Sequence, residues 1–135
     1  MGNNKEVKYI NPEGMPPTFG YTHVVEVKNA RSIYISGQLA LDNEGQIVGK
    51  GDLATQTKQV FENINKALEA AGACFKDVVK LTFFLTDISN MKVVREIRDQ
   101  YVNTANPPAS SAVEVRKLIS EDFLIEIEAI AVGDL

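Results

Sequence analysis

The sequence predicts an α+β fold in which one mixed sheet carries two helices on one of its faces. Short runs with period-two alternation stand toward both ends of the chain, and two longer stretches between them repeat apolar residues at helical spacing. The resulting order is strand, strand, helix, strand, helix, strand, strand, which combines neighbouring strands with crossover helices. With 135 residues, of which 44% are hydrophobic, the chain is expected to form a single domain, residues 1–135.

The first two strands are predicted on either side of a turn. Residues 11–21, NPEGMPPTFGY, are rich in proline and glycine and predict an irregular loop. Residues 22–27 and 32–36 then alternate, and between them Asn29 tolerates a left-handed backbone. We therefore expect a β-hairpin in this part of the chain.

Two amphipathic helices are predicted around a buried strand. Asp52 suits the N-cap and Gly72 the C-cap of the first helix. Its apolar stripe consists of Leu53, Val60, Phe61, Ile64, Leu68 and Ala71. Residues 78–86, VVKLTFFLT, are rich in β-branched and aromatic side chains and predict the buried strand. The second helix has a stripe of Met91, Val94, Ile97 and Tyr101, and we expect Pro107 and Pro108 to end it.

Two closing strands are predicted at residues 112–117 and 124–132, with Ser110 and Ser111 just ahead of the first. In the last strand, Glu126 and Glu128 alternate with an aliphatic set, Ile125, Ile127, Ala129 and Ala131. If the aliphatic set packs on the helices, the glutamates lie on the opposite face of the sheet. An uncovered face of mixed polarity favours oligomerisation.

Charge and composition exclude several classes of function. Fourteen Lys and Arg against eighteen Asp and Glu give a net charge of -4, and without a basic run a nucleic-acid partner is not expected. No apolar run approaches the roughly 20 residues of a membrane span, and the first ten residues lack the apolar core of a signal peptide. We expect a cytoplasmic protein with no membrane partner. A single cysteine, Cys74, and a single histidine, His23, exclude a Cys/His zinc cluster within one chain, so no metal site is predicted.

Five segments, taken in order, resemble one protein family: ISGQLALD, ALEAAGA, VVKLTFFLTDISN, PPASSAVEV and IEIEAIAV. Their order and spacing, over about residues 21–132, are similar to those of the Rid family, also called the YjgF family. The resemblance implies a chorismate-mutase-like fold and a homotrimer whose sheets form a central barrel, with a small-molecule ligand in clefts between subunits. The best-known members are enamine/imine deaminases, which hydrolyse 2-iminobutanoate and 2-iminopropanoate to 2-oxo acids and ammonia without metal or organic cofactor.

The resemblance also implies which residues form the cleft. The family's cleft tyrosine, its Ser-Gly pair and the water-directing glutamate of the last strand match Tyr21, Ser36, Gly37 and Glu126. Glu126 is therefore the candidate catalytic residue. The alternatives are that Glu126 is a solvated residue in cross-strand pairs and that Tyr21 only packs its ring against the loop.

Two cleft positions depart from the family. The arginine that clamps the substrate carboxylate in the deaminases falls on Ser110, and the cysteine often found two residues later falls on Ala112. A serine cannot replace the charge-assisted bidentate contact of a guanidinium. Arg95, at a cleft-facing position of the second helix, is a candidate replacement that would reach toward Ser110. The alternative is an exposed arginine that pairs with an acid such as Asp99.

Three functions remain open from the sequence. The first is a trimeric hydrolase of enamines or imines with an altered substrate, since the carboxylate clamp is absent. The second is a ligand-binding or regulatory trimer that keeps the cleft without catalysis. The third, ribonuclease or translation inhibition, is ranked last because a site with one glutamate and no histidine offers no paired acid and base for RNA cleavage.

Overall fold

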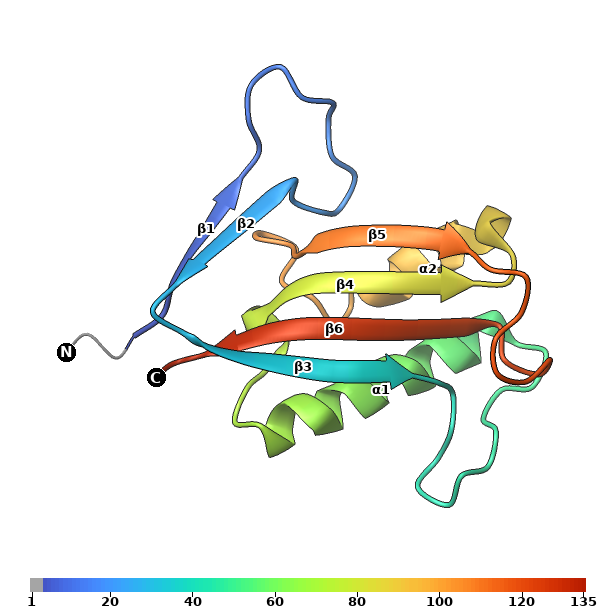
Figure 1. The fold of residues 1–135 in the computed structure, drawn as a ribbon. Helices are drawn as coiled ribbons and strands as arrows, with labels where there is room; N and C mark the ends of the chain where they lie inside the picture. Colours follow the sequence, from blue (N-terminus) through green and yellow to red (C-terminus); the bar gives the residue numbers. More distant parts are fainter. Residues whose placement is uncertain (1–3) are drawn as a thin grey trace.

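The computed structural model describes residues 4–135 and confirms the predicted α+β fold. A four-stranded sheet in the order β3-β6-β4-β5 carries both α-helices on one face, and a two-stranded sheet, β1-β2, projects from its end (Figure 1). The strands are β1 (Glu6–Ile10), β2 (Val24–Lys28), β3 (Arg31–Gln38), β4 (Val78–Leu85), β5 (Ala109–Glu114) and β6 (Ile125–Gly133). The helices are α1 (Leu53–Ala70), α2 (Met91–Arg98) and the short 3-10 helices η1 (Phe75–Asp77) and η2 (Ile88–Asn90).

The core lies between the large sheet and the two helices. β6 contributes its predicted aliphatic face, with Ile125, Ile127 and Ala131 fully buried, while Glu128 is exposed on the other face. The apolar stripe of α1 packs against it, with Phe61 and Ile64 at 0% exposure. Only β4 and β5 run parallel, and the other neighbouring strands of this sheet are antiparallel.

The ends of α1 follow the predicted capping residues. The Asp52 carboxylate accepts hydrogen bonds from the backbone N–H of Thr55 at 3.2 Å and from its hydroxyl at 2.8 Å, and these bonds lower the pKa of Asp52. At the other end Ala71 is the C-cap, one residue before the predicted Gly72, which follows with φ of 73°. Glycine suits that left-handed conformation because it has no Cβ.

The predicted hairpin of residues 22–36 is wrong. β2 pairs with β1, which the sequence analysis did not identify, and β3 pairs with β6. Asn29 has the expected positive φ, 56°, but the turn that it forms leads the chain from one sheet to the other. Period-two alternation identifies a strand without identifying its partner; here the partners are β1, on the other side of the preceding loop, and β6, near the C-terminus.

Two boundaries near the proline pair also differ from prediction. α2 ends at Arg98, well before Pro107, and successive turns follow it. In those turns Tyr101, which was predicted within the helix, stacks on Phe61 of α1 with ring centroids 5.0 Å apart. β5 begins at Ala109, three residues earlier than predicted, which places Ser110 and Ser111 within the strand.

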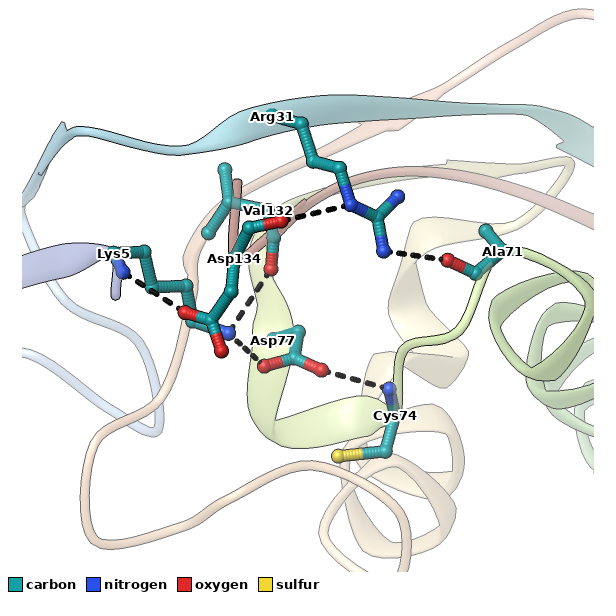
Figure 2. A network of polar contacts seen from close by, with 7 residues as sticks. All are labelled: Lys5, Arg31, Ala71, Cys74, Asp77, Val132 and Asp134. Carbon is teal, nitrogen blue, oxygen red and sulfur yellow. Dashed lines mark hydrogen bonds and ion pairs between the residues drawn. The ribbon is translucent and has the colours of Figure 1, made fainter. Parts of the chain in front are cut away.

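A network of polar contacts ties the two ends of the chain to η1 (Figure 2). The Lys5 ammonium donates to the Asp77 carboxylate and, at 3.1 Å, to the carbonyl of Val132. Asp77 also accepts the backbone N–H of Cys74 at 2.9 Å. Burial opposes ionisation of Asp77, but the hydrogen bonds from Lys5 and Cys74 outweigh it and lower the pKa of this carboxyl. The N-terminal strand is thereby fixed to the last strand and to the start of β4.

Candidate functional site

The predicted site residues fall into two groups on opposite faces of the large sheet. The first group lines a pocket of about 270 Å³ beside the edge strand β5, which we call the edge pocket. The second group, which we call the glutamate group, consists of Ser36, Gly37 and Glu126 on the face away from the helices. The edge pocket is lined by Phe19, Tyr21, Met91, Arg95, Arg98, Ser110, Ser111 and Ala112.

The edge pocket is formed by one face of α2, by β5 and by the loop before β2. Met91, Arg95 and Arg98 recur at i, i+4 and i+7, so they share one face of the helix. Ser110 and Ala112 are paired with the buried residues Leu81 and Phe83 of β4 and therefore lie on the helix-covered face of the sheet.

The loop that carries Tyr21 is fixed to the proline pair. Thr22, at 2% exposure, donates its backbone N–H to the carbonyl of Pro108 at 3.2 Å. Its hydroxyl donates to the carbonyl of Pro107 at 2.6 Å. The two prolines have no N–H to offer a sheet neighbour, but their carbonyls are free to accept. Tyr21 is thereby held over the start of β5.

Arg98 is a pocket residue that the sequence analysis did not select. It is 5% exposed; its Nε donates a hydrogen bond to Oδ1 of Asp99 at 3.0 Å, and its Nη2 forms an ion pair with the same oxygen at 3.0 Å. Gly20, with φ of 80°, packs so closely that a Cβ there would lie 2.2 Å from Arg98 Nη2. The available sequence signal was the spacing of Arg98 from Met91 and Arg95.

Arg95 is exposed and lines the same pocket as Ser110, the residue toward which the sequence analysis expected it to reach. Within residues 4–135 no hydrogen bond or ion pair engages its guanidinium. The alternative pairing of Arg95 with Asp99 is absent among the described residues, and Asp99 forms an ion pair with Arg98 instead. Arg95 is therefore available to a ligand in the edge pocket.

The glutamate group is organised by an irregularity in β3. The register between β3 and β6 shifts between Ile35 and Gln38, and Gly37 lies in that bulge. A Cβ at Gly37 would lie 1.9 Å from Oε2 of Glu126, so only glycine leaves room for this carboxyl. Burial, and secondarily the charge of Glu128, raise the pKa of the half-buried Glu126. A carboxyl with a raised pKa is suited to proton transfer near neutral pH.

The two groups cannot form one site within a single chain. Glu126 lies between Ile125 and Ile127, which are both buried against the helices, so its side chain is on the other face from Ser110. β4 also lies between β6 and β5. A site that combines Glu126 with the edge pocket therefore requires a second copy of the chain.

The remaining residues with metal-binding or nucleophilic chemistry lie outside both groups. Nε2 of His23 is 2.7 Å from the carbonyl of Pro16, and its ring meets Tyr21 edge-on at 5.6 Å between centroids. Cys74 is exposed at η1, rather than serving as a packing residue. Across residues 4–135, no group of three or more His, Cys, Asp or Glu side chains is placed to hold a metal ion.

Known proteins resemble this chain over nearly its whole length. The family model described as endoribonuclease L-PSP matches residues 13–133. A RutC family protein of Pyrococcus abyssi is 42% identical over 128 residues, which cover 94% of this chain and 96% of that protein. The human 2-iminobutanoate/2-iminopropanoate deaminase is 44% identical over 103 residues, 76% of this chain and 73% of that protein.

Solved structures resemble the fold as well. A protein of unknown function of the Rid family from Yersinia pestis has a TM-score of 0.83 at 35% identity and covers 94% of this chain and 98% of its own. RidA from Psychrobacter sp. PAMC 21119 has a TM-score of 0.70 at 36% identity and covers 93% and 99%. A separate finding concerns membranes: within residues 4–135, no helix is long and apolar enough to cross a bilayer.

Proposed function

Because the chain belongs to the endoribonuclease L-PSP family, which includes the Rid proteins, we propose that it is a homotrimer with sites for small metabolites between its subunits. At each site, the edge pocket of one subunit meets the glutamate group of the next, and the site hydrolyses an enamine or imine. We further propose a cytoplasmic location and weak or absent activity on 2-iminobutanoate and 2-iminopropanoate, because Ser110 replaces the arginine that the family resemblance implies.

The observation that carries this proposal is the separation of the two groups. One face of the sheet presents a half-buried carboxyl with a raised pKa, and the opposite face presents a pocket with two guanidiniums. Neither group alone has both a proton acceptor and a group that holds a substrate. In a closed ring, each heterologous interface joins one face of a subunit to a different face of its neighbour. Every interface can therefore contain both groups.

The chemistry that we propose needs only these groups and water. In the protonated imine, Glu126 accepts a proton from a water molecule as the water oxygen attacks the imine carbon, and a tetrahedral aminoalcohol forms. Glu126 returns this proton to the nitrogen, and the C–N bond then breaks as the oxygen forms the carbonyl and passes its hydroxyl proton to Glu126. The products are a carbonyl compound and ammonia, so no oxidant, metal or organic cofactor takes part.

Ser110 is the reason for the expected change of substrate. A charge-assisted hydrogen bond contributes about 1.5–3 kcal/mol, and a bidentate guanidinium–carboxylate contact makes two of them. A serine hydroxyl at the same position offers one neutral donor. The resulting loss in affinity for a 2-imino acid is on the order of a hundredfold or more.

The test measures 2-oxobutanoate or ammonia released from 2-iminobutanoate that is generated in situ. We expect slow turnover or none by the wild type and a large gain by Ser110→Arg, because the substitution adds the missing guanidinium to an otherwise intact site. The double variant Ser110→Arg, Glu126→Gln is expected to be inactive. Rapid turnover by the wild type would contradict the weight placed on Ser110, whereas a silent Ser110→Arg variant would contradict the deaminase site itself.

A second candidate is a trimer that binds a metabolite without turnover. The combined change at Ser110 and Ala112, two neighbouring pocket positions, favours it. It predicts a dissociation constant that does not change in Glu126→Gln. Ribonuclease activity is not favoured, because Glu126 has no paired histidine or second catalytic acid, and His23 is engaged at the carbonyl of Pro16.

A further inference from the structure

We infer that the edge pocket binds a small dianionic group, either a phosphate monoester or a pair of carboxylates, through Arg95 and Arg98 of α2. This inference rests on the proposed function in that it names the substrate class of the same site. It differs from the substrates of the deaminase relatives named above, 2-iminobutanoate and 2-iminopropanoate, which carry a single carboxylate.

Charge is the first argument. The residues that line the edge pocket include two arginines and no carboxylate. Asp99, which pairs with Arg98, lies outside the lining, and its side chain is 48% exposed to solvent. Arg95 has no ion-pair partner within residues 4–135. Asp99 offsets the charge of Arg98, and Arg95 leaves the pocket of one subunit with an excess of positive charge that an anion would neutralise.

The count of free donors is the second argument. Arg98 uses Nε and Nη2 on Asp99, so Nη1 has no protein acceptor in the described part of the chain. Arg95 retains all five of its N–H donors, and the hydroxyls of Tyr21 and Ser110 have no protein partner there either. The hydroxyl of Ser111 already accepts from Lys80 at 3.0 Å. A single carboxylate has two oxygens to share among these donors, whereas a phosphate monoester has three terminal oxygens and a dicarboxylate has four.

Preorganisation is the third argument. Arg98 is nearly fully buried and is fixed between Asp99 and the backbone at Gly20, so little side-chain entropy remains to be lost on binding. Arg98 is buried and has an N–H donor without a protein acceptor, and Arg95 beside it has no protein partner. Proteins commonly recognise phosphate and paired carboxylates with arginines of this kind. The volume, about 270 Å³, suits a small metabolite.

The experiment titrates the folded full-length protein by calorimetry at low ionic strength. The probes are inorganic phosphate, succinate, the monocarboxylate propionate and the neutral butanone. We expect phosphate or succinate to bind at least about tenfold more tightly than propionate, and butanone not to bind. The tighter of phosphate and succinate identifies the source of the dianion.

Variants assign the binding to the edge pocket. Arg95→Gln is expected to raise the dissociation constant of the dianion about ten- to a hundredfold, which is the range for the loss of one charge-assisted contact. Arg116→Gln, the same substitution at an exposed arginine outside this pocket, is the matched control and should leave the dissociation constant unchanged. Because Arg98→Gln can unfold a chain that buries this residue, Arg95→Gln is the deciding variant.

The outcomes separate the inference from the proposed function. If propionate binds as tightly as the dianions, or if Arg95→Gln leaves dianion binding unchanged, the inference is overturned even when imines are hydrolysed. If dianions bind through Arg95 while both the wild type and Ser110→Arg fail to hydrolyse the imine, the proposed catalysis fails and the inference stands. Glu126→Gln, on the opposite face of the sheet, should abolish turnover without removing dianion binding.

Discussion

Gly37 leaves the space that the carboxyl of Glu126 occupies, since a Cβ at residue 37 would lie 1.9 Å from Oε2. The nearest atoms belong to the flexible end of a side chain, so the fold can accommodate a methyl group by moving that carboxyl. Gly37→Ala is therefore expected to lower turnover, measured in the Ser110→Arg background, by at least about tenfold while the melting temperature changes by only a few degrees. A large loss of stability would show that Gly37 serves the strand rather than Glu126.

The raised pKa of Glu126 predicts a pH-dependent stability. The folded chain holds this proton more tightly than the unfolded chain, so the free energy of unfolding falls as pH rises above the ordinary value of 4.5. Glu126→Gln has no carboxyl to ionise at this position, so this fall in the free energy of unfolding should be absent from the variant. Thermal unfolding should therefore show the variant to be more stable than the wild type at pH 7, with the advantage disappearing near pH 4. Glu44→Gln, at an exposed loop position, should show no such crossover.

The family resemblance selected several residues that the structure places side by side. Tyr21, Arg95, Ser110 and Ala112 were selected from the sequence, and the structure brings all four to one pocket. Arg98 was not selected, because a buried arginine within an apolar stripe has no pattern that separates it from an exposed one. Its burial depends on Gly20, which is far from it along the chain.

At the scale of the elements, periodicity located both helices and most of the strands but not the pairing of the first ones. β1 was missed because its Glu, Lys and Ile side chains face outward, and the short alternation of Val7 and Tyr9 resembles a polar terminus. The pairing of β3 with β6, at the other end of the chain, leaves no local signal. The same holds for the network around Lys5 in Figure 2, whose partners are more than 70 residues away.

That network predicts a local weakness in the N-terminal sheet. Lys5→Met removes the partly buried contacts to Asp77 and Val132 and leaves the carboxylate without its cation. We expect the free energy of unfolding to fall by about 1–2 kcal/mol. Faster amide hydrogen exchange should be concentrated in β1 and β2. Lys8→Met, which disturbs only an exposed pair 3.9 Å long, is the control, and an equal effect of both variants would contradict a specific role for Lys5.

At the scale of the whole molecule, the two faces of the large sheet have different chemistry and are both needed for a complete site. The sequence predicted an uncovered face from the alternation of Glu126 and Glu128 with the aliphatic residues of β6, and the single chain has that arrangement. The sequence did not predict that the site residues divide between the faces. That division follows from strand pairing: Ser110 and Ala112 lie opposite the buried residues Leu81 and Phe83 of β4, whereas Glu126 lies opposite Phe84, whose side chain is on the other face.

A complementation experiment tests this division directly. Wild-type subunits lack the guanidinium at residue 110, and subunits with Ser110→Arg and Glu126→Gln lack the carboxylate, so each homotrimer is expected to be nearly inactive on 2-iminobutanoate. When equal amounts are unfolded and refolded together, about one site in four should combine the edge pocket of a double-variant subunit with the glutamate group of a wild-type neighbour. Activity should then approach a quarter of that of Ser110→Arg alone, while sedimentation reports trimers. Mixing the two homotrimers without unfolding is the control and should restore nothing. If refolded mixtures stay inactive although mixed trimers form, Glu126 and residue 110 do not meet across an interface, because only a site shared by two subunits can be rebuilt from two defective chains.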